Sequence, residues 1–461
     1  MPAPARRAGQ TTARHRRVHT TAHPAWLAAD AAARQSYGRL LAWLACQWRD
    51  VAAAEDALAA ALEKALALWP AQGVPTAPDA WLLTVARREL LQAARRQRLH
   101  DSPQVQAVLA HLPHVVRNDG RNDGRSCGST HEPSDEHAPL LPDSRLGLLF
   151  VCAHPAIDAA VRPALMLQAV LGLPAQQIAQ AMLTSPAAMA QRLVRAKQKI
   201  RDAGLRFEPP GADELPERLP AVLEAIYAAY GLGWEAAPDA SAPPDSGDGD
   251  EPRVQGLRDE AIFLADLLCS LLPASPARAE AEGLLALMLL CEARVAARQG
   301  PDGRFIPLAE QDTARWQAPL IDQGNWLLAN AARWQVPGPF QLEAAIQSAH
   351  CTRRDTGATP WPGILLLYRR LLAIAPSLGA EVAHAVACAQ AGELARAGAL
   401  LAALDSPRLA SYQPYWVARG HVAALLGHPA PARQALQRAI GLTSAPAVRA
   451  HLQARLQALG G

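Results

Sequence analysis

The sequence predicts an all-α protein with more than one domain. Half of its 461 residues are apolar and only 5% are aromatic, and alanine and leucine dominate. Because both are strong helix formers and β-branched runs are sparse, this composition favours helices that pack through small side chains. Apolar residues also recur at helical spacing along most of the chain. The chain is too long for one ordinary core, so we expect about two or three domains.

The charge is distributed unevenly between the two parts of the chain. Residues 1–206 hold 25 Lys and Arg against 16 Asp and Glu, a net charge of +9. Residues 207–461 hold 20 against 26, a net charge of −6. This asymmetry predicts one module that binds a polyanion and one module that avoids polyanions.

Three helices are predicted after an arginine-rich tail. We expect residues 1–24 to be a disordered basic tail, because no apolar stretch of a signal peptide follows its arginines. The first two helices are separated by a break near residues 49–52. A loop is expected at 70–78, before the third helix, because this stretch contains three prolines and one glycine. Asp79 is expected to cap the third helix.

The second and third of these helices differ in what their faces carry. The second has an expected apolar face formed by Leu58, Leu62, Ala65, Leu66 and Trp69. The third begins with Trp81 and sets a single acid, Glu89, against five arginines: Arg87, Arg88, Arg95, Arg96 and Arg98. An aromatic ring beside a proline-rich loop, followed by arginines, suits a platform for unpaired bases. A place for Trp81 in the core is the alternative.

Residues 100–142 lose helical periodicity and are interpreted as a flexible tether. They contain "RNDGRNDG", a tandem tetrapeptide, and then "STHEPSDEHAP". The second stretch holds five potential metal ligands: His131, Glu132, Asp135, Glu136 and His137. Because no helix would fix these side chains, a solvated loop is favoured over a metal site. Helical patterning resumes at 143–205, and a second linker is expected at 234–252 before a helical remainder.

Residues 174–201 have the spacing of a helix-turn-helix motif. Pro174 introduces a short helix, and Ser185 is expected to cap a second helix that starts at Pro186. Ala179 supplies the small residue needed where the two helices cross, and Met189 follows ten residues later as an anchor.

The second helix of this motif has two different faces. Four apolar residues at steps of four, three and four are expected to pack inward: Met189, Leu193, Ala196 and Ile200. Five cations precede the only acid, Asp202, which favours an anionic partner such as a DNA major groove. The candidate DNA-contacting residues are Ser185, Ala188, Gln191, Arg192, Arg195 and Lys199. A solvated basic face is the alternative.

A weak internal repeat follows near the end of the chain. Residues 391–404 match residues 426–439 at an offset of 35, with Gly392 and Ala397 corresponding to Gly427 and Ala432. Small residues at this spacing let paired helices approach closely, as in tetratricopeptide-type hairpins with a period of about 34. Chance similarity in an alanine-rich chain is the alternative.

The sequence lacks the motifs that are typical of disulfide-bonded proteins, membrane proteins and enzymes. The seven cysteines are scattered and no pair forms C-x-x-C, which favours reduced thiols in a cytoplasmic protein. The longest apolar run, at 284–291, is too short to cross a bilayer. Neither a phosphate-cradling glycine loop nor a nucleophile elbow nor an acid–base set is found. We therefore expect no enzyme, no cofactor and no metal.

Several segments, taken in order, resemble bacterial sigma factors of the extracytoplasmic-function class. "AEDALAAALEKALALWPAQGVPTAPDAWLLTVARRELLQAARRQR", residues 54–98, resembles their second conserved region. Residues 143–207, from "DSRLGLLF" to "RDAGLRF", resemble their fourth region. "ELPERLPAVLEAIYAAYGLGWEA", residues 214–236, and the acidic remainder are similar to the subgroup with a long tetratricopeptide-like C-terminal extension.

The resemblance implies a protein that binds core RNA polymerase and directs it to promoter DNA. A domain at 25–99 would hold the polymerase-binding residues Glu55, Asp56, Glu63 and Trp69. The same domain would open the −10 element with Trp81, Arg87, Arg88, Arg95 and Arg96. The tether at 100–142 would lead to a domain at 143–207, whose helix 186–201 would read the −35 element. The extension at 208–461 could bind an inhibitory or signalling protein.

Two departures from the family pattern bear on activity. Ala59 and Ala60 stand where the family usually has a Gln-Glu pair, which removes a carboxylate from the polymerase-facing surface. Ala383 and His384 stand where an Asn-Arg pair is usual. We hypothesise that the acidic extension regulates by shielding the basic surfaces or by docking on polymerase. An ordinary helix-turn-helix regulator with a helical sensor domain, and a helical-repeat scaffold, are the alternative functions.

Overall fold

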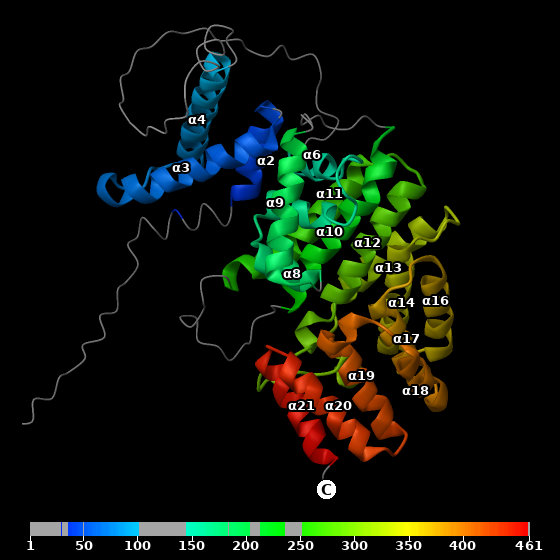
Figure 1. The fold of residues 1–461 in the computed structure, drawn as a ribbon. Helices are drawn as coiled ribbons and strands as arrows, with labels where there is room; N and C mark the ends of the chain where they lie inside the picture. Colours follow the sequence, from blue (N-terminus) through cyan, green and yellow to red (C-terminus); the bar gives the residue numbers. More distant parts are fainter. Residues whose placement is uncertain are drawn as a thin grey trace, which may run out of the picture. The chain divides into compact units, whose positions relative to one another are not determined.

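The computed structural model describes six stretches of the chain and residue 29 (Figure 1). These stretches are residues 36–48, 50–100, 144–182, 184–202, 213–235 and 251–459. Their regular structure is helical, apart from one isolated bridge between Gln299 and Phe305. The all-α prediction is confirmed. Within these stretches, none of the helices combines the length and the apolar character that a bilayer crossing requires.

The chain divides into two compact units, and each is described by itself. Residues 1–40 and 53–116 belong to the first unit, and residues 41–52 and 117–461 to the second. The expected tail at 1–24, all of the expected tether at 100–142 except His100, and most of the linker at 234–252 lie outside the described residues. The potential metal ligands of the tether are among them.

The described part of the first unit consists mainly of two long helices, α3 (Val51–Gln72) and α4 (Pro78–His100). Only the first residues of α2 (Tyr37–Trp48) belong to it. The predicted break near 49–52 is confirmed. Small residues of α3 at helical spacing, together with Leu58, are buried, as are three residues of α4: Leu82, Ala86 and Leu90. The rings of Trp69 and Trp81 meet edge to face, with their centroids 5.4 Å apart. The two helices therefore pack through small side chains and one aromatic pair.

Three details of this unit differ from the sequence prediction. Asp79 does not cap α4, because the helix already begins at Pro78, a residue well suited to the first helical position. Its carboxylate instead accepts a hydrogen bond of 2.8 Å from the hydroxyl of Ser36 and pairs with Arg39. Leu66 is 48% exposed, so it does not share the buried face of Leu58. The loop is also shorter than predicted, since α3 continues through Pro70 to Gln72.

Four helices open the described part of the second unit after its first short segment. They are α6 (Ser144–Cys152), α7 (Arg162–Leu171), α8 (Ala175–Ala181) and α9 (Pro186–Asp202). Arg162 holds the loop before α7, because its guanidinium donates to the carbonyl oxygens of Ile157, at 2.8 Å, and of Pro155, at 2.9 Å. The left-handed Gly172, with φ of 62°, ends α7 and lets the chain turn into α8.

Helix α10 (Leu215–Glu235) packs on both the preceding and the following helices. It contacts α6, α7 and α8 as well as α11 (Glu251–Leu271) and α12 (Pro276–Glu292). Arg218, only 4% exposed, donates to the carbonyl oxygen of Phe150 at 3.3 Å and to the carboxylate of Glu214 at 2.8 Å. Phe150 lies in the last turn of α6, where carbonyl groups lack helical partners, so a cation there is favourable.

The remaining helices complete the C-terminal extension, and two of them, α13 and α14, pack on α12. They are α13 (Ala318–Ala332), α14 (Pro339–Cys351), α15 (Arg353–Thr356), α16 (Trp361–Ile374), α17 (Leu378–Gln390), α18 (Leu394–Ala403), α19 (Gln413–Leu425), α20 (Pro429–Leu442) and α21 (Pro446–Ala458). Short 3-10 turns lie at Val295–Ala297, Leu308–Glu310, Thr313–Arg315 and Pro407–Ser411. Residues 284–290 of α12 are buried on every side, as expected of a helix that is apolar all round.

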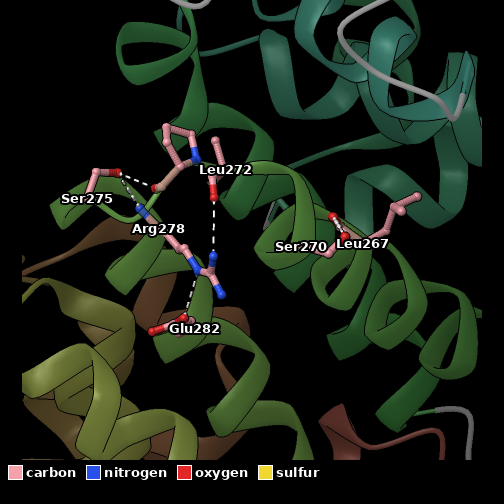
Figure 2. Close-up of polar contacts among 7 residues, drawn as sticks. Leu267, Ser270, Leu272, Ser275, Arg278 and Glu282 are labelled. Carbon is pink, nitrogen blue, oxygen red and sulfur yellow. Dashed lines mark hydrogen bonds and ion pairs between the residues drawn. The ribbon is translucent and has the colours of Figure 1, made fainter.

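The start of α12 is fixed by a polar cluster (Figure 2). The Ser275 hydroxyl accepts a hydrogen bond from the backbone N–H of Arg278 at 3.3 Å, which caps the helix. The Arg278 side chain donates to Glu282 one turn later, at 2.9 Å, and to the carbonyl oxygen of Leu272 at the end of α11. One arginine thus ties the end of one helix to the start of the next.

The internal repeat corresponds to two matching helical hairpins, α17–α18 and α19–α20. Gly392 and Gly427 both have positive φ, of 90° and 72°, in the turn of each hairpin. The turns repeat the same hydrogen bonds: Glu393 N to Cys388 O and His428 N to Ala423 O, each at 2.9 Å. Ala397 and Ala432, at matching positions of the two hairpins, are fully buried. The two-unit repeat is therefore confirmed as structure.

Candidate nucleic-acid interface

Helices α8 and α9 cross through a tight turn, as the motif spacing predicts. The backbone N–H of Ala188 donates to the Ser185 hydroxyl at 3.3 Å, so Ser185 caps α9. Ala179 and Ile178 of α8 are fully buried, and the N–H of Thr184 returns to the carbonyl oxygen of Ala179 at 2.9 Å. A small buried residue at the crossing allows this close approach.

The inner face of α9 anchors the helix in the surrounding core. Met189 and Leu193 are each 1% exposed and Ala196 is 8% exposed, whereas Ile200 is only half-buried. The three-to-four-residue spacing of these side chains fixes the rotation of α9 about its own axis. The opposite face is consequently held toward solvent.

The outer face of α9 carries the predicted polar and basic residues. The exposed ones are Gln191, Arg192, Arg195 and Lys199. Arg195 donates to the side-chain oxygen of Gln191 at 3.4 Å, one turn away. Sequence reasoning missed Val194, which is 65% exposed on this helix. An exposed apolar side chain beside arginines suits contact with a thymine methyl group. The sequence held a signal for this residue, because Val194 is apolar but does not fit the spacing of the inward-facing apolar residues.

A hollow of about 420 Å³ lies between α9 and the loop before α7. Arg192, Arg195 and Lys199 line one side, and residues 156–161 with Asp158 line the other. The Asp158 carboxylate accepts a hydrogen bond of 3.0 Å from the N–H of Ala160, so it also serves the loop. Three cations against one acid make the hollow favourable for an anionic group such as a backbone phosphate.

The candidate −10 residues of the first unit lie on one helix. Arg87, Arg88, Arg95 and Arg96 of α4 are exposed. Glu89, the acid that lies among these arginines, forms an ion pair with Lys64 of α3, so its carboxylate is engaged with a neighbouring helix. Trp81 is half-buried, and its ring packs against that of Trp69. It is therefore partly a core residue, as one alternative had it, and partly accessible to a ligand, as the other required.

The candidate polymerase-binding residues of α3 do not all reach the surface. Asp56 and Glu63 are exposed and Glu55 is half-buried. Trp69 is only 2% exposed, so its assignment as a contact residue is wrong. Its indole instead fills the space between α3 and α4, because a large apolar ring on the buried face gains more from packing than from exposure.

Metal and thiol chemistry receive no support from the described stretches. They contain no group of three or more His, Cys, Asp or Glu side chains that could hold a metal ion. Five cysteines described there form no disulfide with one another: Cys152, Cys269, Cys291, Cys351 and Cys388. Burial raises the pKa of the Cys269 thiol to about 12, which suppresses its thiolate.

Comparison with known proteins gives one relative and one family. The chain is 35% identical over 433 residues to the uncharacterized protein R00370 of Rhizobium meliloti (strain 1021), covering 94% of this chain and 95% of the relative. The two proteins belong to one family. Residues 218–332 also match the family of unknown function DUF6596. This match begins inside α10 and ends with α13, so it covers the first part of the extension. No solved structure matches the chain.

Proposed function

We propose that this protein is an RNA polymerase sigma factor that binds core polymerase and directs it to promoter DNA. The observation that carries the proposal is the outer face of α9, where Arg192, Arg195 and Lys199 are exposed on the second helix of a capped helix-turn-helix. A helix in this arrangement enters a DNA major groove through its exposed face.

A second basic helix favours a sigma factor over an ordinary DNA-binding regulator. Helix α4 lies in a separate compact unit and presents exposed arginines after the half-buried Trp81. A regulator needs only the motif at 174–201, whereas promoter opening also needs a surface for unpaired bases. A helical-repeat scaffold would require neither basic surface.

Reconstituted transcription separates the three functions. The purified full chain is added to bacterial core RNA polymerase with a library of promoter fragments, and start sites are mapped. A sigma factor restores start-site-specific transcription. A regulator binds duplex DNA without restoring it, and a scaffold does neither, so either of these results would overturn the proposal.

A matched pair of variants tests the role of α9 in the same assay. Arg192→Ala is expected to lower discrimination at one position of the −35 element by roughly 1–3 kcal/mol. Arg433→Ala removes the same charge from an exposed position on α20 and should leave transcription unchanged. A uniform loss across all sequences with Arg192→Ala would make this residue a phosphate contact instead of a base reader.

The proposed regulatory role of the extension needs a test in the intact chain. Deleting residues 211–461 would remove Arg218 and the helix that covers α6, α7 and α8, so the DNA-binding helices would lose part of their own core. Neutralising exposed acids avoids this problem, for example Asp322→Asn, Asp355→Asn and Asp405→Asn together. Unchanged promoter output and unchanged affinity for core polymerase would exclude shielding by these charges.

A further inference from the structure

A cavity of about 730 Å³ lies among the helices of the extension. Helices α14, α16, α17, α19 and α21 and the segment 305–316 contribute its walls. Its walls are mainly apolar and include Trp316, Trp361, Tyr368, Val386 and Val417. Volumes of about 300 to 1,000 Å³ with mainly apolar walls and a few polar groups are typical of sites for small organic ligands.

One of the two arginines in this cavity has a structural role. Arg353 donates to the carbonyl oxygens of Ala309, at 2.6 Å, and Gln311, at 2.8 Å. Its guanidinium also lies over the ring of Trp316, 5.1 Å from the centroid. These contacts hold the segment 305–316 in place as a wall, and they engage both terminal nitrogens of Arg353.

The other arginine, Arg455 of α21, is half-buried, and its guanidinium contacts one hydrogen-bonding side chain. One of its terminal nitrogens lies 3.0 Å from Nδ1 of His421, whose Nε2 lies 3.0 Å from the carboxamide of Gln390. A guanidinium has five N–H donors, so most of them remain for another partner. Among the described residues, no carboxylate oxygen lies within 4.0 Å of a guanidinium nitrogen of Arg455, so the arginine forms no ion pair there. Glu310, whose charge favours the Arg455 cation from a distance, also lines this cavity and is exposed.

The neighbouring groups compensate this charge only in part, because the one carboxylate that favours the cation, Glu310, is exposed to solvent. Burial lowers the pKa of Arg455 itself, which means that the cation is partly desolvated. Burial, and then the charge of Arg455, lower the pKa of His421, so its imidazole is neutral near pH 7. A partly desolvated cation without an ion-pair contact costs free energy, and an anionic group entering the cavity would recover part of it.

We propose that this cavity binds a small molecule with an apolar body and one carboxylate, and that the guanidinium of Arg455 holds the carboxylate. The aromatic and valine side chains of the walls remove the apolar body from water. Arg455 selects the anion, because a guanidinium presents its donors in the geometry of a carboxylate. The site is separate from α9 and does not depend on the proposed promoter-binding function.

Calorimetric titration of the full chain with decanoate, decan-1-ol and decylammonium tests the proposal. These probes share one apolar body and differ in charge. Decanoate is expected to bind at one site per chain. Its dissociation constant should be at least roughly tenfold lower than that of decylammonium. No saturable binding of decanoate at about 1 mM, or equal binding of the anion and the cation, would overturn the proposal.

Three variants localise the binding. Arg455→Met should weaken decanoate roughly ten- to hundredfold and affect decan-1-ol little, since it removes the anion's partner and keeps apolar bulk. Arg433→Met removes an exposed arginine that does not line the cavity and should change neither probe. Ala383→Trp places a large ring into the cavity from α17 and should abolish binding of both probes. Decanoate binding that survives Arg455→Met or Ala383→Trp at full strength would refute the site.

Discussion

Gly283 offers a sharp test of how the extension is packed. It is buried in α12, and an added Cβ atom would lie 2.7 Å from the backbone nitrogen of Gln341 in α14 and 2.9 Å from its Cα atom. Ordinary contacts begin at 3.4 Å, and backbone atoms cannot rotate away as a side chain can. Helix α14 must therefore move away from α12 if residue 283 carries a methyl group.

The expected cost follows from two opposing contributions. Replacing glycine by alanine inside a helix stabilises it by roughly 0.5–1 kcal/mol. Forcing extra volume into a packed crossing costs about 1–3 kcal/mol. Gly256→Ala in α11 is the matched control, because its Cβ meets nothing within 4 Å and it is exposed. We expect Gly283→Ala to be less stable than Gly256→Ala by about 1–3 kcal/mol.

Hydrogen–deuterium exchange of the full chain measures this difference locally, in peptides from α12 and α14. Gly283→Ala should speed exchange in both helices, and Gly256→Ala should not. Adding Gln341→Ala should not restore protection, because the clash involves the backbone of residue 341. Protection in Gly283→Ala equal to that of Gly256→Ala would refute the close crossing, and full rescue by Gln341→Ala would assign the clash to a side chain.

Three further predictions concern stability. Ser185→Ala should lower the free energy of unfolding by about 1 kcal/mol, seen in the urea midpoint, because the N–H of Ala188 loses its cap. Leu193→Ala should cost about 2–4 kcal/mol by thermal or urea unfolding, while its exposed neighbour Val194→Ala stays within about 0.5 kcal/mol. Burial, followed by nearby arginines, lowers the pKa of His350 from 6.5 to about 4. The unfolded chain therefore binds an extra proton between these pH values, so stability falls as pH decreases through this window. His350→Gln should make this dependence shallower by up to about 1.4 kcal/mol per pH unit, measured as the unfolding free energy at several pH values.

Local signals in the sequence predicted helices α8 and α9 and the turn between them correctly. Ser185 and Pro186 have strong preferences for the start of a helix, and the apolar spacing of Met189 and Leu193 identifies one face without knowledge of the rest of the fold. The repeat was also predictable, because the turn glycines Gly392 and Gly427 need positive φ.

Features that depend on neighbouring helices were not predictable in the same way. Leu66 and Trp69 both fit an apolar stripe on α3, yet the position of α4 buries only the tryptophan. Asp79 has the preference of a cap, but Ser36 and Arg39 bind its carboxylate inside the first turn. The cavity around Arg455 draws its walls from segments as far apart as residues 305 and 455, a pairing that no local pattern encodes.

The two-sided burial of α10 limits how this chain can tolerate changes in length. An α-helix turns by about 100° per residue, so a one-residue insertion midway along α10 would rotate Tyr230 and its neighbours away from α12 while Arg218 stayed against α6. Insertions and deletions among relatives should therefore fall at 203–212 or 236–250, and residues 215–235 should keep a constant length. A constant length of α10 should keep the helices packed on its two sides in the same relative orientation in all members of the family.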